Sequence, residues 1–86
     1  MRGRDHISIY PYGISRNHIE YAIEHLKLCG DIVRNVEDAD LILTLKSHHR
    51  RNFQKFMELQ KKGIPIFVLR SNTIAQIEAF ILERLL

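Results

Sequence analysis

Apolar and polar positions follow two different periods along this chain, and the change from one period to the other marks its predicted elements. Short runs rich in β-branched and aromatic residues predict strands, whereas apolar residues spaced by three and four predict helices. The predicted strands cover residues 6–10, 31–35, 41–45 and 64–69. A turn signal at 11–13 ends the first of them. Strands and amphipathic segments are therefore expected to alternate along most of the chain.

Capping residues set the limits of the predicted helices. Ser15, Ser47 and the segment 70–72 can each satisfy free backbone N–H groups at a helix start. Gly30 and Gly63 suit the helix ends that precede strands. The expected inner faces of the helices are formed by Ile19, Ala22, Ile23 and Leu26, by Phe53, Phe56 and Met57, and by Ile74, Ile77, Phe80, Ile81 and Leu85.

The element order is β-α-β-β-α-β-α, with helical crossovers between most consecutive strands. Such crossovers predict a mostly parallel four-stranded sheet with three helices on its faces, hence a three-layer α/β fold. The expected strand order is 2-1-3-4, which places the first and third strands in the centre. With 86 residues and a hydrophobic content of 45%, the chain is expected to form one domain, residues 1–86.

Membrane insertion and secretion are not indicated. No apolar stretch approaches the roughly 20 residues that a membrane-spanning helix needs. Residues 1–6 lead directly into the first predicted strand and lack the apolar core and cleavage site of a secretory signal. We therefore expect a protein of the cytoplasm or of an organelle.

The strand at 41–45 ends in a cationic segment, Lys46–Arg51, and this junction is the most informative part of the chain. In open parallel sheets, ligands bind beyond the carboxyl ends of the strands. The junctions at 10–16, 46–51 and 70–72 should therefore lie close together, with helix N-termini and cations suited to phosphate groups. The candidate nucleic-acid-binding residues are Tyr10, Tyr12, Arg16, Lys46, His48, Arg50, Arg51, Arg70 and Asn72.

The expected ligand of this edge is nucleic acid, with single strands favoured. Its Arg and Lys side chains would bind phosphates, while Tyr10 and Tyr12 would stack on bases, as is typical of proteins that hold single strands. The residues do not distinguish DNA from RNA or indicate a sequence preference. The alternative is that the basic residues only form a solvated surface, since exposed charges contribute little energy.

Metal and covalent chemistry are not indicated. His48 and His49 are adjacent, so on a helix they point about 100° apart and cannot bind one ion together; no metal or other cofactor is expected. A phosphoryl-transfer enzyme is an alternative, because some small parallel α/β proteins carry a reactive Cys or His just after the first strand. Ile14 and Ser15 stand there instead, and Cys29 is expected to be a small buried side chain at a helix end. We therefore expect a protein without enzymatic activity.

Segments 10–16, 38–45 with the basic residues that follow, 63–73 and 76–78 carry a resemblance to one family. Together they resemble the segment after the ATPase core in plastid and cyanobacterial AAA ATPases that bear an Arg-x-x-x-His nucleic-acid-binding domain, relatives of the sporulation stage III AA ATPase. The resemblance implies a single-stranded nucleic-acid-binding accessory module, in the cytoplasm or the plastid stroma. It also implies a chain that either stands alone or was cut from a longer ATPase-containing polypeptide.

Two departures from this family limit what the resemblance implies. The chain has no Gly-x-x-x-x-Gly-Lys-Ser/Thr loop, so it should not hydrolyse ATP by itself. It also has no convincing Arg-x-x-x-His core. An ATPase domain in cis or in trans is the expected protein partner. The remaining alternative is a protein-interaction module that docks on that ATPase or self-associates through the apolar end of the last helix, Leu82, Leu85 and Leu86.

Overall fold

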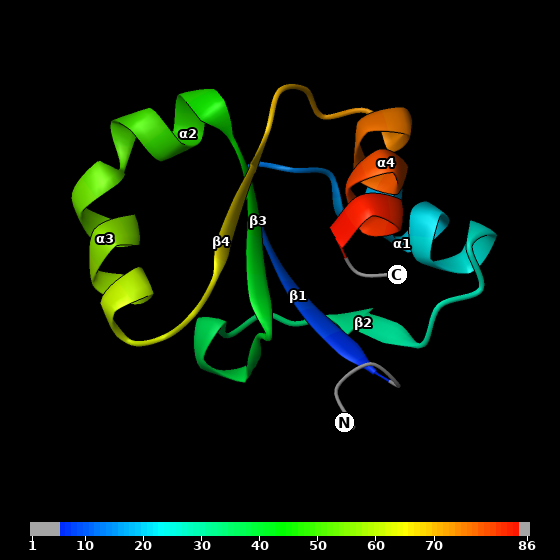
Figure 1. Ribbon diagram of the computed structural model, residues 1–86, viewed down its shortest axis with the longest axis horizontal. Coiled ribbons are helices and arrows are strands. Elements are labelled where there is room, and N and C mark those ends of the chain that lie inside the picture. The colour runs from blue at the N-terminus through cyan, green and yellow to red at the C-terminus, as the bar shows by residue number, and fades with distance from the viewer. Residues whose placement is uncertain (1–5, 85–86) are drawn as a thin grey trace.

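A computed structural model describes residues 6–84 of the chain (Figure 1). Its elements are, in order, β1 (Ile7–Tyr12), α1 (Arg16–His25), β2 (Gly30–Ile32), the 3₁₀ turn η2 (Val36–Asp38), β3 (Leu41–Leu45), α2 (Lys46–Arg51), α3 (Phe53–Lys61), β4 (Ile66–Leu69) and α4 (Ile74–Arg84). All paired strands run parallel, in the order β2-β1-β3-β4. The predicted fold class and strand order are therefore confirmed.

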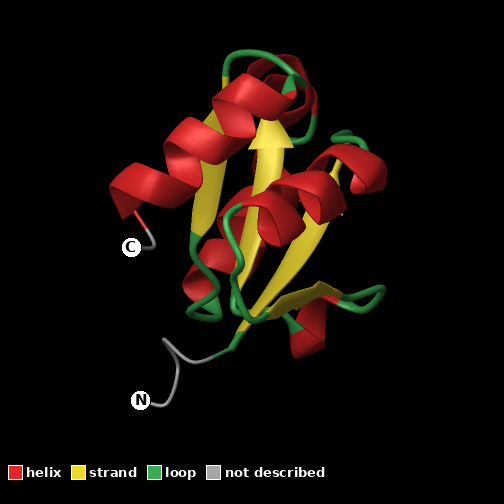
Figure 2. Cartoon of the chain, turned by 90° about the vertical axis from the view of Figure 1, so that its right-hand side faces the viewer, coloured by secondary structure: helices red, strands yellow, loops and turns green. Residues whose placement is uncertain are grey.

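Helices cover both faces of the sheet, which gives three layers. In Figure 1, α2 and α3 lie on one side of the strands, and α1 and α4 lie together on the other side. Figure 2 looks onto the second side and shows both of its helices in front of the strands. The helical crossovers return the chain to the amino edge of the sheet, as parallel pairing requires. All strands therefore end at the same edge.

The main hydrophobic core lies between the sheet and the helix pair α1 and α4. Alternate strand residues point toward these helices, because successive side chains of a strand face opposite sides of the sheet. The buried cluster consists of Ile9, Ile14, Ile19, Ala22, Leu41, Leu43, Leu69, Ile77, Phe80 and Ile81. Most of the apolar burial that stabilises the domain is thus on this side of the sheet.

The opposite face of the sheet carries a smaller buried group. Phe56 of α3 is buried and contacts the ring of Tyr12, with 5.1 Å between the ring centroids. Thr44 is fully buried beside it, and its hydroxyl donates a hydrogen bond of 2.8 Å to the carbonyl oxygen of Tyr12. The hydroxyl is therefore satisfied in spite of its burial. These contacts hold α3 against the central strands.

β1 extends through Tyr12, two residues beyond its predicted end. The predicted turn at Pro11 is wrong, because the strand tolerates a missing backbone donor at this position. The carbonyl oxygen of Ile9 accepts a hydrogen bond from the amide of Val33, so the backbone groups of Ile9 face β2. Backbone groups alternate along a strand, and those of Pro11 therefore face the same side as those of Ile9. The pairing with β2 ends opposite Ile9. Pro11 therefore leaves no sheet hydrogen bond unmade.

The single helix predicted after Ser47 is two helices. α2 begins at Lys46 and has Leu45 at its N-cap position, without a side-chain cap, so the predicted capping by Ser47 is wrong. The break lies at Asn52, whose backbone leaves the helical region with φ −119° and ψ 37°. The amide nitrogen of its side chain donates a hydrogen bond of 2.9 Å to the carbonyl oxygen of His48. The backbone amide of Asn52 donates to the same carbonyl oxygen at 3.1 Å, so His48 accepts two hydrogen bonds at the break. Side-chain bonds of this kind are associated with bent or interrupted helices.

Several further boundaries differ from their predictions. α1 already ends at His25, so Gly30, predicted as a helix end, is instead the first residue of β2. β4 begins at Ile66 instead of residue 64. β2 ends at Ile32 instead of residue 35, since η2 already begins at Val36. α4 is capped by Thr73, whose hydroxyl accepts a hydrogen bond from the amide of Gln76 at 3.2 Å. The segment 70–72, predicted as the cap, instead forms the connection from β4.

The apolar end of the last helix is described only in part. Leu82 is 52% exposed, whereas Leu85 and Leu86 lie outside the described residues, so the predicted self-association through these leucines stays a prediction. No helix of the described part of the chain has the length and apolar character needed to span a bilayer.

Candidate functional site

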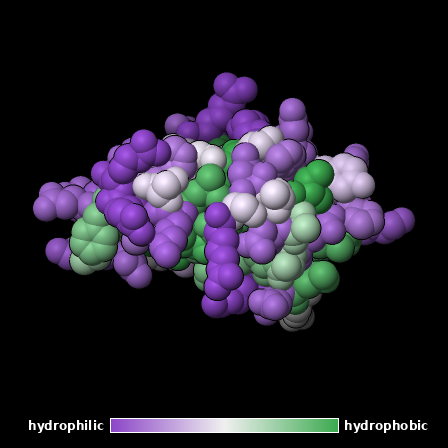
Figure 3. Space-filling view, turned by 90° about the horizontal axis from the view of Figure 1, so that it is seen from above, coloured by the Kyte–Doolittle hydropathy of each residue, from purple (hydrophilic) through white to green (hydrophobic). Residues whose placement is uncertain are grey.

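The carboxyl ends of the strands form one edge of the molecule. Figure 3 looks onto this edge from above and shows a mostly hydrophilic surface with smaller apolar areas. The junctions that follow β1, β3 and β4 all reach it. The expected convergence of these junctions is therefore present, and it follows from the parallel topology.

A shallow pocket lies at this edge, between the carboxyl ends of β3 and β4. Its volume is about 300 Å³, and it is lined by Leu45, Lys46, Ser47, Arg50 and Arg70. Leu45 is in register with Leu69, so the residues that follow these two strands are brought side by side. We call this group the β3–β4 pocket. It combines three cations with one hydroxyl, which together can donate hydrogen bonds to a tetrahedral oxyanion.

Within the described residues, the three cations of the β3–β4 pocket have no acidic partner. Within residues 6–84, the ion pairs join His6 to Asp31 and His25 to Glu78, and neither pair lies at the pocket. The segment from residue 41 to residue 57 contains no Asp or Glu. The positive charge of the pocket is therefore not neutralised by a neighbouring carboxylate, and an anion is the complementary ligand.

The β1–α1 junction is held in place by a side chain from the far end of the chain. Ser15 is the N-cap of α1 and accepts a hydrogen bond from the amide of His18. The side-chain oxygen of Asn72, after β4, accepts from the amide of Ser15 at 3.1 Å and lies 3.3 Å from Nδ1 of His18. For both contacts to be hydrogen bonds, Nδ1 of His18 must carry a proton. Asn72 therefore connects the two junctions.

Gly13 brings the β1–α1 junction against α2. Its φ is +80°, and a β-carbon at this position would lie 2.3 Å from a ring carbon of His48. The imidazole of His48 also packs edge-on against Tyr12. The absence of a side chain at Gly13 therefore allows the close approach of these two segments.

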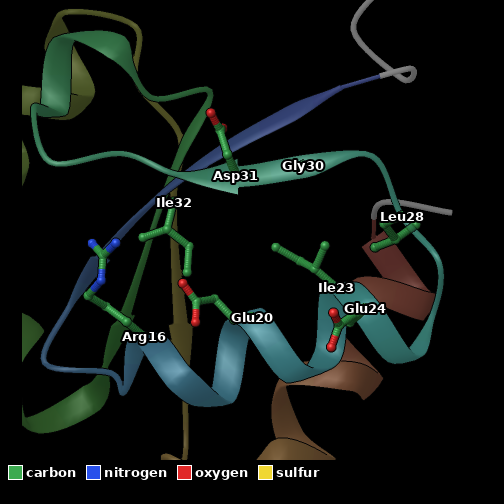
Figure 4. A pocket seen from close by; sticks show the side chains of 8 residues that line it. All are labelled: Arg16, Glu20, Ile23, Glu24, Leu28, Gly30, Asp31 and Ile32. Atoms are coloured by element: carbon green, nitrogen blue, oxygen red, sulfur yellow. The ribbon is translucent and has the colours of Figure 1, made fainter.

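A larger pocket lies elsewhere. It has about 500 Å³ and lies between α1 and β2, as Figure 4 shows. Arg16 lines it together with the carboxylates of Glu20 and Glu24. Asp31 lines it as well, but Figure 4 shows its carboxylate pointing away from α1. These acidic groups disfavour a phosphate ligand, so this pocket is not the candidate site despite its size.

The predicted site residues are thus divided among several positions. Lys46, Arg50 and Arg70 lie together, whereas Arg16 turns toward the pocket between α1 and β2. Arg51 is exposed and does not line the β3–β4 pocket.

The polar and aromatic candidates have structural contacts. The side chain of Asn72 accepts a hydrogen bond from the amide of Ser15, and the ring of His48 lies against Gly13. The ring of Tyr12 is half-buried beneath Lys55, whose Nζ lies 5.0 Å from the ring centroid. Tyr10 is half-buried on the same face of the sheet. A ligand-binding role of these residues stays a prediction.

The only cysteine of the chain is far from the candidate site. Cys29 lies just before β2, at the amino edge of the sheet, and it is exposed. The predicted burial of this side chain is therefore wrong, because the short connection between α1 and β2 leaves it at the surface. Within residues 6–84, no group of three potential metal ligands is found.

One comparison with known proteins decides the family. The family model of the phosphotyrosine protein phosphatases matches residues 7–86, which include every element from β1 to α4. The chain belongs to the phosphotyrosine protein phosphatase family. No curated protein and no solved structure gives a significant match.

This membership contradicts the resemblance to the segment beside the AAA ATPase core. The function inferred from that resemblance, a nucleic-acid-binding accessory module, is contradicted with it, and no finding supports the alternative of a module that docks on the ATPase. Both the resemblance and the family match extend over nearly the whole chain, but the distinctive part of the resemblance was limited to the short motifs at 10–13 and 70–73.

The prediction of a protein without enzymatic activity is also contradicted, because the family is one of phosphatases. That prediction used the missing thiol after the first strand as its main argument. The phosphate-binding character of the carboxyl edge agrees with a phosphatase, but it does not by itself indicate the family.

Proposed function

We propose that this phosphatase-family protein acts on phosphate monoesters of the phosphotyrosine class, with the phosphate bound in the β3–β4 pocket. The observation that carries the proposal is the set of three cations, Lys46, Arg50 and Arg70, that surround this pocket without a carboxylate partner in residues 6–84. The family match supports the reaction class, and the cations support the position of the phosphate.

The charge of the pocket suits the ligand. A phosphate monoester carries close to two negative charges at neutral pH. The two guanidinium groups can each form paired hydrogen bonds with phosphate oxygens, while Lys46 contributes a point charge. The hydroxyl of Ser47 adds a further donor. The pocket is open to solvent, so within it the phosphate group makes the main contacts.

The reaction that fits this site is transfer of the phosphoryl group to water. The oxygen of water bonds to phosphorus, the bond between phosphorus and the phenol oxygen breaks, and the proton of water passes to the released phenol. The transition state is loose and distributes charge over the outer phosphate oxygens, so positioning and electrostatic stabilisation supply most of the catalysis. Arg50, Arg70 and Lys46 are placed to provide that stabilisation.

A covalent route through a thiol is not part of the proposal. Nucleophilic catalysis by cysteine requires the thiolate beside the reacting atom. Cys29, the only cysteine, lies at the amino edge of the sheet, whereas the β3–β4 pocket lies at the carboxyl edge. The Cys29→Ser variant should therefore react as the native protein does.

The experiment is to measure phosphate release from phosphotyrosine and from p-nitrophenyl phosphate, with the rate in buffer subtracted. The native protein and Cys29→Ser should release phosphate equally. The Arg50→Ala/Arg70→Ala variant should lose at least about tenfold in kcat/KM, since charge-assisted hydrogen bonds contribute about 1.5 to 3 kcal/mol each.

Lys62→Ala is the matched control. Lys62 is an exposed cation at the end of α3, on the amino edge, and its removal changes the net charge without touching the pocket. The kcat/KM of this control should equal that of the native protein. Release no faster than in buffer alone, or equal loss in the control and the double variant, would contradict the proposed function.

A further inference from the structure

β4 is an edge strand of the sheet, and its outer side is open. Among residues 6–84 it pairs only with β3. In Figure 1 no described segment lies in front of β4, whereas Figure 2 shows the end of α4 crossing one face of β4 and extending past it on the side away from β3. Arg84 of α4 lies over the ring of Phe67 on that face, and no described strand pairs with the outer edge of β4. An edge strand presents a row of backbone N–H and C=O groups that another extended chain can pair with.

The backbone groups on this open side can be assigned from the register. The amide of Ile42 donates to the carbonyl oxygen of Pro65 at 2.9 Å, so the backbone groups of Pro65 face β3. Groups alternate along a strand, and those of Phe67 and Leu69 therefore face β3 as well. The N–H and C=O groups of Ile66 and Val68 point outward. One short segment thus offers alternating donors and acceptors to a partner.

The side chains of β4 provide a complementary apolar contact. Phe67 packs against Phe80 of α4, with 5.0 Å between the ring centroids. Val68 faces the opposite side of the sheet and is 43% exposed, which is high for a β-branched residue of a parallel strand. An added strand would cover part of this side chain.

The open edge leads directly into the β3–β4 pocket. Arg70 follows Leu69, the last residue of β4, and lines the pocket with Lys46 and Arg50. A peptide lying along β4 would therefore end beside three unpaired cations. This continuity between an open strand edge and a cationic pocket favours an extended peptide that carries a phosphate group.

We propose that β4 is the docking edge for the peptide substrate, which pairs with it as an additional strand and places its phosphorylated side chain in the β3–β4 pocket. This inference rests on the proposed function and specifies its substrate as an extended phosphopeptide. The main-chain hydrogen bonds supply affinity, as in other cases of strand addition, and the phosphate fixes the register.

The first test uses Val68→Pro, with Val68→Ala as the matched control. Proline removes the outward N–H of this residue without removing a hydrogen bond to β3, and such a position of an edge strand tolerates it. Calorimetry measures the affinity for an eight-residue phosphotyrosine peptide. This affinity should fall by roughly five- to tenfold in Val68→Pro, as expected when one hydrogen bond is lost and the adjacent ones are weakened. Val68→Ala should change this affinity less than Val68→Pro.

The free amino acid separates this inference from the proposed function. Binding of phosphotyrosine itself should be equal in the native protein and both Val68 variants, because it uses only the pocket. If phosphotyrosine binds and the peptide binds no more tightly, docking on β4 is wrong while the proposed function stands. If neither ligand binds, the proposed function is wrong.

A second test uses peptides methylated at one backbone nitrogen at a time. Strand pairing predicts that methylation at every second residue weakens binding, whereas methylation between these positions has no effect. Uniform effects along the peptide would overturn the inference.

Sedimentation of the free protein tests whether a second copy of the chain occupies the β4 edge. A dimer that Val68→Pro dissociates would show this, and would overturn the proposal that the edge binds a peptide substrate.

Discussion

The side-chain oxygen of Asn72 lies 3.1 Å from the backbone nitrogen of Ser15, 57 positions earlier in the chain. The contact joins the connection after β4 to the start of α1, across the carboxyl edge of the sheet. Nδ1 of His18 lies 3.3 Å from the same oxygen. The relative position of two of the three junctions at this edge therefore depends on one amide side chain.

Removal of that side chain should destabilise the domain. In Asn72→Ala the amide of Ser15 loses its partner, and we expect a loss of about 1 to 3 kcal/mol in the free energy of unfolding. Asn72→Asp is the matched control, since it keeps an acceptor oxygen at the same place. Urea unfolding followed by circular dichroism measures both. Equal stability of Asn72→Ala and the native protein would show that the contact is not significant.

Two glycines with positive φ allow a separate prediction about the contact between the β1–α1 junction and α2. Gly13→Ala places a β-carbon against the ring of His48, whereas a β-carbon at Gly63, with φ +92°, meets nothing within 4 Å. Both changes incur the backbone cost of about 1 to 2 kcal/mol for a left-handed residue. Gly13→Ala should lose roughly a further 1 to 3 kcal/mol from overpacking.

The difference between the two alanine variants therefore measures how rigidly His48 is held. It is obtained from their unfolding midpoints under the same conditions. If the two variants unfold at the same denaturant concentration, the ring of His48 moves aside at no cost, and its contact with Gly13 does not fix the junction.

Two phenylalanines of α3 should differ strongly in their effect on stability. Phe56 is 1% exposed beneath the sheet, and Phe53 is 54% exposed on the same helix. Phe56→Ala should lower the free energy of unfolding by about 3 to 5 kcal/mol, as is usual for a buried aromatic residue. Phe53→Ala should remain within about 0.5 kcal/mol of the native protein, like most surface changes. Thermal unfolding gives both values; comparable losses would contradict the assigned orientation of α3.

The periodicity of the sequence was sufficient for the topology. The apolar run 41–45 and the helical spacing from Ile19 to Leu26 predict the buried central strand and the first crossover that are found. The break at Asn52 could not be predicted in the same way, because pattern alone does not reveal the bond from the Asn52 side chain to the carbonyl oxygen of His48 that accompanies it.

The site was predictable only in part. The parallel topology brings the junctions to one edge, so the position of Lys46 and Arg70 follows from the order of the strands. Arg16 was expected there as well, but its side chain lines the pocket with Glu20 and Asp31 instead. The direction of a long, exposed side chain depends on its rotamer and its neighbours, and spacing along the sequence does not determine it.

The function could not be predicted from these residues. Unpaired cations at a strand edge suit the phosphates of nucleic acid and those of a phosphorylated tyrosine equally well, because both are recognised by the same charge-assisted hydrogen bonds. The match of residues 7–86 as one unit to a phosphatase family is the basis for the proposed ligand class. The cations of the pocket favour an anion, while the family indicates which anion is proposed.

The most direct test of the central claim is an NMR titration of the ¹⁵N-labelled protein with phosphotyrosine. If the phosphate binds in the β3–β4 pocket, the largest shifts should occur at the amides of Lys46, Ser47, Arg50 and Arg70, and those of Cys29 and Asp31 should not move. Arg50→Ala/Arg70→Ala should abolish the shifts. Shifts centred on the pocket between α1 and β2, or none at saturating phosphotyrosine, would contradict the account.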